Sequence, residues 1–339
     1  MIKVRYESFG GIIALERYPM LVFVNRAKMR RLGYRSTPLW ESDSDRLSAP
    51  TEIHFALTNR CNRDCGYCYM DSGKDQPPDL SSDEIIKFID AIAEMGVFHI
   101  ALGGGESLLR PDIFRLGRYI RSRGLVPNLT TNGTLIDSSI AEECRVFGQV
   151  NVSIDGLHPD SRYPRSADDL ECACRALKYL KKAGIRTGIN FVVHRYNFSL
   201  IEDVFRFARR NRLEDIEFLR LKPVGRARNL YYRLRCRRQQ HRDFYPLLLK
   251  LSRSYRQDCK IDCSYVPMVC FHQPSKKIMN KFQVRGCDGG NLLAAVDADG
   301  GVKACSFASG SAGHYSQFRR LWEDSDHFLQ FYQWIETAP

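Results

Sequence analysis

Residues 58–68 read TNRCNRDCGYC, and they place Cys61, Cys65 and Cys68 in a C-x3-C-x2-C spacing. The segment is mostly polar and contains a glycine, so it does not resemble a stretch of buried, inert thiols. A [4Fe–4S] cluster is usually held by four cysteines, and three local thiolates would leave one iron open to a ligand. Zinc is the alternative, but structural zinc needs a closed shell of four ligands, and no fourth ligand is apparent nearby. The stretch therefore favours an open-iron cluster.

The cysteine stretch follows the first of six apolar or β-rich runs, which alternate with segments of helical periodicity. The runs cover 52–57, 98–102, 125–130, 149–154, 185–193 and 215–221, and the helical segments cover 82–95, 112–123, 137–146, 167–183 and 199–211. This alternation predicts an α/β fold with a parallel sheet, either open or curled into a barrel. Ligands of such folds bind beyond the carboxyl ends of the strands, so residues directly after each strand are the candidate site residues.

The cysteine spacing, with Tyr67 before the last cysteine and a strand in front, resembles the signature of radical S-adenosylmethionine (SAM) enzymes. The resemblance covers about residues 50–225 and implies a partial (β/α)6 barrel, in agreement with the six runs. It also implies that the open iron binds the amino and carboxylate groups of SAM. An electron from the reduced cluster would then cleave a carbon–sulfur bond and release a 5′-deoxyadenosyl radical, which abstracts hydrogen from a substrate.

Glycine and polar residues stand at four of the strand ends and are assigned to SAM binding together with Tyr67. They are Gly103, Gly104, Gly105 and Glu106 after the second run, Thr131 and Asn132 after the third, Ser153 and Asp155 after the fourth, and Asn190 in the fifth. The glycine run resembles the family's SAM-binding motif, whose acidic member contacts the methionine amine, although Ser107 stands where proline is usual. Asn190 has an alternative role as a hydrogen-bond partner in the core.

Arg165 is a further candidate, for the methionine carboxylate, because a guanidinium group pairs well with a carboxylate. A solvated surface arginine is the alternative.

A second cysteine group lies near the end of the chain, where Cys287 and Cys305 have the spacing C-x12-G-x4-C. A hairpin of strands at 292–296 and 302–304, turning at Asp299 and Gly300, would bring the two thiols together. The spacing resembles the twitch or SPASM extension of radical SAM enzymes, in its shorter twitch form because no cysteine follows Cys305. We expect an auxiliary [4Fe–4S] cluster with Cys263 and Cys270 as the remaining ligands. An open three-ligand cluster and a zinc site are the alternatives.

These features predict four parts along the chain. They are an N-terminal β-hairpin and helix extension at 1–50, the radical SAM barrel at 51–225, a basic linker and helix at 226–258, and a twitch-like domain with a C-terminal helix at 259–339.

Composition bounds the class of protein. The chain has 339 residues, of which 44% are hydrophobic, so general disorder is excluded. No run approaches the ~20 apolar residues that span a bilayer, and the N-terminus lacks the pattern of a secretory signal. We therefore expect a cytoplasmic protein in which the 12 cysteines are reduced and available for metal binding.

Positive charge is concentrated in residues 201–260, which hold 17 Lys or Arg and 7 Asp or Glu, a net charge of +10 out of +12 for the chain. An acidic peptide or partner protein is favoured over nucleic acid, because no nucleic-acid-binding motif accompanies the charge. A solvated helix face is the remaining explanation.

The expected function is radical modification of a ribosomally synthesised peptide by cyclisation, epimerisation, thioether formation or backbone excision. Residues 1–50 are short for a complete peptide-recognition domain, so a separate recognition protein is expected, together with a reducing partner such as flavodoxin or ferredoxin. One alternative is the maturation of a tungsten or other oxidoreductase or its cofactor. A second is a non-enzymatic iron–sulfur or zinc scaffold that binds nucleic acid.

Overall fold

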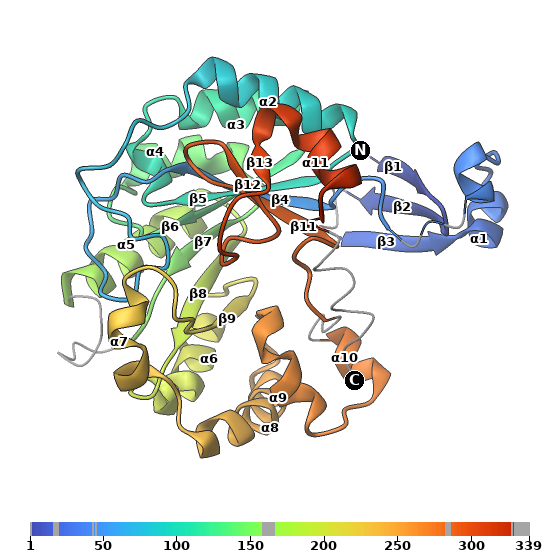
Figure 1. Ribbon diagram of the computed structural model, residues 1–339. Helices are drawn as coiled ribbons and strands as arrows, with labels where there is room; N and C mark the ends of the chain where they lie inside the picture. Colours follow the sequence, from blue (N-terminus) through green and yellow to red (C-terminus); the bar gives the residue numbers. More distant parts are fainter. Residues whose placement is uncertain are drawn as a thin grey trace.

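The computed structural model describes residues 2–15, 20–42, 44, 46–157, 167–281, 286–326 and 328. Six parallel strands form its core in sequence order, and helices cover their outer side (Figure 1). The strands are β4 (Glu52–Thr58), β5 (His99–Gly104), β6 (Val126–Thr131), β7 (Val150–Ser153), β8 (Thr187–Val193) and β9 (Ile216–Arg220). The helices between them are α2 (Ser82–Glu94), α3 (Ile113–Ser122), α4 (Ser138–Glu143), α5 (Ala167–Lys182) and α6 (Ile201–Arg210). The partial barrel predicted from the sequence is confirmed.

Helix α2 illustrates why these segments fold as they do. Ser81 and Glu84 form a capping box, in which each side chain accepts a hydrogen bond from the other residue's backbone N–H. The helix then buries one apolar face against the sheet, where the Phe88 ring packs edge-on against Phe55 with ring centres 5.3 Å apart. Burying each such side chain contributes about 1.5–3 kcal/mol.

The later part of the chain extends this sheet at both edges. Strand β10 (Cys259–Ile261) adds in parallel beside β9, and β11 (Leu293–Val296) adds in parallel beside β4. Strands β12 (Gly301–Lys303) and β13 (Gly313–His314) continue antiparallel from β11. The predicted hairpin at 292–296 and 302–304 is therefore present, but it belongs to the barrel sheet, which has ten strands.

Among the described residues, five more helices follow the six-stranded core. They are α7 (Ala227–Leu234), α8 (Arg238–Tyr255), α9 (Val266–Cys270), α10 (Lys276–Lys281) and α11 (Phe318–Asp324). The helix predicted within residues 226–258 corresponds to α8, whereas the linker predicted before it contains helix α7. Part of the helix expected over the last 30 residues lies outside the described residues. Within the described residues, no helix is long and apolar enough to cross a bilayer.

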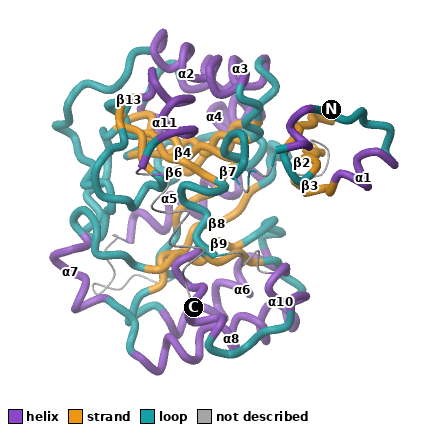
Figure 2. Tube along the Cα trace, turned by 45° about the vertical axis from the view of Figure 1, so that its right-hand side comes forward, coloured by secondary structure: helices purple, strands orange, loops and turns teal. Residues whose placement is uncertain are grey.

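The N-terminal residues form a separate antiparallel sheet that projects from the side of the barrel (Figures 1 and 2). It consists of β1 (Ile2–Glu7), β2 (Gly10–Leu15) and β3 (Met20–Asn25), followed by helix α1 (Arg26–Arg31). The β-hairpin predicted within residues 1–50 is present as β2 and β3, and β1 is an additional strand.

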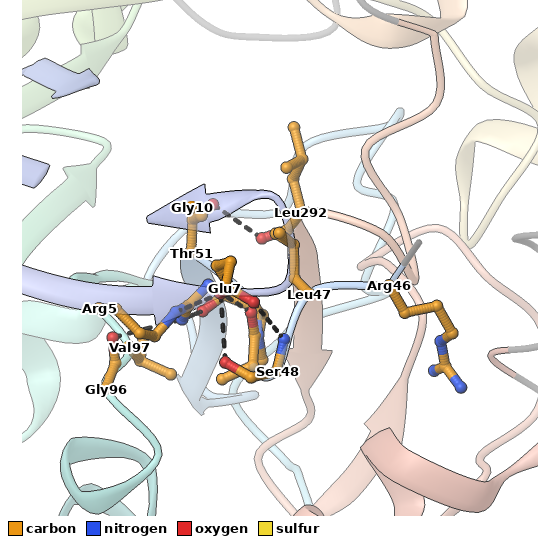
Figure 3. A network of polar contacts seen from close by, with 12 residues as sticks. Arg5, Glu7, Gly10, Arg46, Leu47, Ser48, Thr51, Gly96, Val97 and Leu292 are labelled. Atoms are coloured by element: carbon orange, nitrogen blue, oxygen red, sulfur yellow. Dashed lines mark hydrogen bonds and ion pairs between the residues drawn. The ribbon is translucent and has the colours of Figure 1, made fainter. Parts of the chain in front are cut away.

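Buried polar contacts attach the N-terminal sheet to the barrel (Figure 3). The Arg5 guanidinium donates hydrogen bonds to Glu7 at 2.7 Å, and to the carbonyl oxygens of Ala49 at 2.7 Å and Pro50 at 2.8 Å. Glu7 in turn accepts from the backbone N–H of Ser48 at 2.8 Å. Because charged hydrogen bonds of this kind are strong when buried, the sheet has a defined position on the barrel.

Candidate active site

A cavity of about 1300 Å3 runs through the inside of the barrel, and we call it the barrel cavity. Its wall contains most of the residues assigned from the sequence, which come from five strands and their following loops. These are Cys61, Tyr67, Cys65 and Cys68, the glycines Gly103, Gly104 and Gly105, and Thr131, Asn132, Ser153, Asp155 and Asn190. The strand-end rule therefore selected residues that share one cavity. Their individual roles stay predictions.

The segment that carries the three cysteines, residues 59–73 (the cysteine loop), is fastened to three other elements. Arg63 forms an ion pair of 2.6 Å with Asp169 in the first turn of α5. Asn62 donates to the Thr134 hydroxyl at 2.8 Å, in the loop after β6. Arg226, just before α7, donates to the carbonyl oxygen of Cys65 at 3.0 Å. The three thiols are thus held on a constrained backbone, which suits a cluster site.

Gly225 allows the chain after β9 to lie against the cysteine loop. Its φ of +57° is in the left-handed region, and a Cβ atom there would lie 2.4 Å from the carbonyl oxygens of Cys68 and Tyr69. Residue spacing in the sequence does not reveal that this glycine has a left-handed backbone and packs against two carbonyl oxygens.

The glycine run after β5 serves two different purposes. Gly104 and Gly105 press against the backbone of the preceding strand and loop, because added Cβ atoms would lie 2.3 Å from the Thr58 oxygen and 2.1 Å from the Arg60 oxygen. Gly103 has open space where its Cβ would be, on the cavity wall. Only Gly103 therefore matches the expected close approach of backbone to a ligand.

Glu106 is fully buried and does not belong to the cavity wall, unlike the glycines before it. One carboxylate oxygen accepts from the Thr131 hydroxyl at 2.8 Å, and the other accepts from the backbone N–H of Asn132 at 2.8 Å. Glu106 thus joins the end of β5 to the end of β6. The predicted contact of Glu106 with the SAM amine stays a prediction.

Two other assigned polar residues have defined partners on the cavity wall. The Tyr67 hydroxyl donates a hydrogen bond to the Asp155 carboxylate, which links the cysteine loop to the end of β7. Asn190 accepts from the Asn151 amide at 2.8 Å. Arg165 lies outside the described residues.

Ionisable groups near the starts of β4 and β5 line the lower part of the barrel cavity, and the sequence analysis did not predict them as site residues. Glu52 lies 2.9 Å from the imidazole of His54 and 3.7 Å from that of His99. Burial disfavours the charged imidazole of His54, but the hydrogen bond and charge of Glu52 outweigh this effect and raise the pKa of His54. Burial also raises the pKa of Glu217, opposite them. These residues stand on inward-facing positions of strands that read as apolar runs, which is why the pattern concealed them.

Three cysteines of the second group are brought together, and we call Cys263, Cys287 and Cys305 the second thiol group. A hydrogen bond with Cys287 lowers the pKa of the Cys263 thiol to about 7. Cys305 lies close enough to influence both. Cys270, at the end of α9, is exposed, and no contact among the described residues joins it to the other three. Cys259 is buried in β10, as a small apolar side chain would be.

An aromatic contact connects the two cysteine groups. The rings of Tyr69, directly after Cys68, and Phe307, close to Cys305, are 4.8 Å apart. The Lys222 ammonium group lies 3.8 Å from the centre of the Phe307 ring and 2.5 Å from the Asp262 carboxylate, next to Cys263. The two cysteine groups are therefore neighbours on one side of the barrel cavity.

The donor atoms of the cysteine loop fit an iron–sulfur cluster. Three half-buried thiols reach the cavity wall, and thiolate is the ligand of such clusters. Within the described ranges, no group of three or more His, Cys, Asp or Glu side chains is arranged to hold one metal ion. The open space at Gly103 faces the same cavity.

Comparisons with known proteins agree with this geometry. Residues 55–208 match the model of the radical SAM superfamily. The chain is 28% identical to an AdoMet-dependent heme synthase of Methanosarcina barkeri over 300 residues, which cover 83% of this chain and 84% of the relative. It is also 28% identical to the mycofactocin maturase MftC of Mycolicibacterium smegmatis over 295 residues, covering 84% and 73%.

Among solved structures, Streptococcus suis SuiB bound to S-adenosylmethionine is similar with a TM-score of 0.74. The match covers 97% of this chain and 88% of SuiB at 15% sequence identity, which establishes a shared fold. Another structure of SuiB contains its precursor peptide SuiA.

Proposed function

Because the chain belongs to the radical SAM superfamily, we propose that this enzyme modifies a ribosomally synthesised peptide. The observation that carries the proposal is the barrel cavity. At about 1300 Å3 it exceeds the ~300–1,000 Å3 of ordinary small-molecule pockets, and it extends from the cysteine loop to the N-terminal sheet. A cavity of this length suits a segment of peptide chain whose reacting atom lies near the cysteine loop.

We assign Cys61, Cys65 and Cys68 as ligands of the [4Fe–4S] cluster that the superfamily uses. When bound, the cluster and SAM would supply the 5′-deoxyadenosyl radical that abstracts hydrogen from the substrate. The chain's own residues position these groups. Gly103 offers its backbone to SAM, and the Tyr67 hydroxyl orients the Asp155 carboxylate toward the same space by a hydrogen bond.

The remaining polar wall residues complete the assignment. Thr131, Asn132, Ser153 and Asn190 would offer hydrogen bonds to the SAM ribose or carboxylate. Glu106 acts through Thr131 and Asn132, whose positions it fixes. The type of bond made in the peptide stays open among cyclisation, epimerisation, thioether formation and backbone excision.

We further propose that the second thiol group holds an auxiliary cluster. Cys263, Cys287 and Cys305 are mutually close, and cysteine thiolates are the usual ligands of iron–sulfur clusters. Cys270 would join them as a fourth ligand only after the end of α9 moves. The three thiols alone support a cluster with one open iron.

A tetrapyrrole substrate is the second candidate. One of the similar proteins is a heme synthase, and a cavity of about 1300 Å3 would accommodate a porphyrin as well as a peptide segment. The ionisable groups Glu52, His54 and His99 on its lower wall could pair with substrate carboxylates or amides. Oxidoreductase maturation, the other enzymatic alternative from the sequence, has no observation in its favour, and a non-enzymatic scaffold is inconsistent with superfamily membership.

The first test uses the reconstituted enzyme, SAM and a reductant. We expect 5′-deoxyadenosine from the wild-type protein and none from Cys65→Ala, while the control Cys174→Ala behaves as wild type. A wild-type protein that contains iron but makes no 5′-deoxyadenosine would refute the proposed chemistry.

The second test separates the two substrate classes. Iron coproporphyrin is titrated into the enzyme and followed by its Soret absorbance, and deuterated candidate peptides are scored by deuterium transfer to 5′-deoxyadenosine. Transfer from a peptide supports the proposal. A saturable Soret shift, with deuterium transfer from the porphyrin alone, would replace it by the tetrapyrrole candidate.

A further inference from the structure

Exposed arginines cover α7 and the start of α8. The six side chains, which we call the arginine face, are those of Arg228, Arg233, Arg235, Arg237, Arg238 and Arg242. In the part of the chain that the structure describes, none of the six forms an ion pair. Elsewhere, exposed arginines such as Arg118, Arg145 and Arg206 each face a carboxylate. Other exposed arginines, such as Arg31, Arg209 and Arg210, also have no ion pair among the described residues, so the face is distinguished by the clustering of its six arginines.

Exposed aromatic rings accompany the charge. Tyr232 is 75% exposed, and the Arg235 guanidinium lies 5.0 Å from its ring centre. Phe271 is 65% exposed beside Arg242. Arg228 and Tyr232 are spaced i and i+4, so they share one side of α7, and Arg235 directly follows the helix. Arginines combined with exposed aromatic rings are typical of protein–protein interfaces.

The arginine face adjoins the cysteine loop. Arg226, which precedes α7, donates to the Cys65 carbonyl at 3.0 Å and pairs with Asp71 of the loop at 2.9 Å. Arg226 itself belongs to the cavity wall, whereas the six arginines of the face are not among the described residues that line the cavity. A molecule bound to the face would thus lie outside the barrel, close to the three thiols.

We propose that the arginine face docks an acidic electron-transfer protein that reduces the cluster held by the cysteine loop. The inference rests on the proposed function, because reductive SAM cleavage consumes one electron. The donor protein is oxidised by one electron, the carbon–sulfur bond of SAM breaks, and methionine and the 5′-deoxyadenosyl radical form. A peptide substrate must enter the cavity to react, but an electron donor needs only to approach the loop from outside.

The positive charge of the arginine face would mainly raise the rate at which the enzyme and the acidic electron-transfer protein associate. Complementary charge steers association and can raise association rates by about 10–10³-fold at low salt. The effect weakens as salt shortens the screening length from about 10 Å at 0.1 M to about 3 Å at 1 M. Reduction by an acidic donor should therefore slow markedly with ionic strength.

The test measures how fast the reconstituted enzyme, with SAM bound, oxidises a reduced flavodoxin of strongly negative net charge. Stopped-flow absorbance of the flavin is the readout. We expect the second-order rate constant to fall about tenfold or more in Arg228→Glu/Arg233→Glu, with a smaller fall in Arg228→Gln/Arg233→Gln. The salt dependence should flatten in both. The matched control Lys28→Glu/Arg31→Glu on α1 changes the net charge equally and should keep the wild-type rate.

A small neutral donor, photoreduced 5-deazaflavin, separates this inference from the proposed function. All variants should cleave SAM normally with it, which also shows that they fold. If wild type fails with deazaflavin, the proposed function is wrong. If the flavodoxin rate is unchanged in Arg228→Glu/Arg233→Glu, the docking inference is wrong and the proposed function stands. Loss of binding to an acidic peptide or to DNA, with an unchanged flavodoxin rate, would assign the face to that ligand instead.

Discussion

The carboxylate of Glu106 is the residue whose predicted and observed environments differ most. The glycine run in front of it suggested a ligand contact, yet both of its oxygens accept hydrogen bonds from the end of β6. A pattern of residue types identifies a motif, but it does not reveal which member turns inward. In this loop the backbone of Gly103 lies on the cavity wall. Glu106, three residues later, instead binds the end of β6.

The two roles of Glu106 can be separated in the protein without SAM. Glu106→Gln replaces a charged acceptor of three internal hydrogen bonds, from Thr131, Asn132 and the backbone N–H of Leu108, and should lower the free energy of unfolding by about 1–3 kcal/mol. Urea denaturation of the cluster-free protein measures this, with the exposed Glu143→Gln as a control. An unchanged unfolding free energy combined with a raised KM for SAM would instead favour a direct contact with SAM.

The pKa of the His54 imidazole depends on the charged groups around it inside the barrel cavity. Its pKa is raised because Glu52, Glu217 and Asp288 favour the charged imidazole more than burial disfavours it. The ion pair therefore contributes stability that is fully present below the ordinary histidine pKa of about 6.5. The contribution is lost as the pH rises through the raised value.

The measurement is a histidine-selective NMR titration. We expect the His54 midpoint above 6.5 in the wild type, and a lower midpoint in Glu52→Gln, where the main favourable partner is neutral. His314, an exposed histidine at the start of a short helical turn, serves as an internal reference. Equal midpoints for His54 in the two proteins would contradict the ion pair.

At the scale of elements, the junction between β9 and α7 shapes the cysteine loop. Gly225 has a positive φ and lies against two carbonyl oxygens of that loop. Gly184, exposed after α5, also has a positive φ, of +75°, but has nothing within 4 Å of its Cβ position. Both glycines therefore need a left-handed backbone, but only at Gly225 would an added Cβ atom collide with neighbouring atoms.

Substitution of each glycine by alanine separates the cost of backbone strain from the cost of overpacking. Gly184→Ala should lower the free energy of unfolding by about 1 kcal/mol, the cost of a left-handed alanine. Gly225→Ala should cost about 2–4 kcal/mol, because overpacking is added, and it should reduce the iron bound by the cysteine loop. Chemical denaturation and iron analysis test this pair. Equal costs would mean that the loop moves aside without resistance.

Most elements were predictable because their periodicity is local. The six core strands, the helices between them and the hairpin near the end of the chain each carry a pattern within a dozen or so residues. The pairing of β10 with β9 and of β11 with β4 carries no such pattern. These contacts join segments far apart in the sequence, and a strand of three residues such as β10 is too short for alternation to be read.

For the whole molecule, the second thiol group has an unusual location in the sheet. Cys263 follows β10 at one edge, whereas Cys287 and Cys305 flank the hairpin at the opposite edge.

We expect Cys263→Ala to remove about four of about eight irons, one cubane of two, and to increase amide hydrogen exchange in β10 and β11. Cys270→Ala should change neither iron content nor exchange, since its thiol is exposed and apart from the others. A loss of iron in Cys270→Ala would restore it as a ligand.

The sequence predicted the two cysteine groups and the barrel, because spacing and strand order are written along the chain. It did not predict that the two groups are neighbours, or that Tyr69 contacts Phe307 between them. It placed most of the charge in residues 201–260 but could not distinguish the arginines that lack partners from Arg206, Arg226 and Lys260, which form ion pairs. That distinction depends on which carboxylates fold beside them.

The location of the second thiol group also imposes an order on how the protein is made. Strands β10 and β11 are close in sequence but pair at opposite edges of the sheet, with six strands between them. Cys263 can meet Cys287 and Cys305 only after the sheet has rolled far enough for its edges to face one another. Delivery of iron and sulfide to this site must therefore come late in biogenesis, after the barrel has formed. A chain that stalls before rolling would expose two unpaired sheet edges and three reactive thiols at once, the state most vulnerable to aggregation and oxidation.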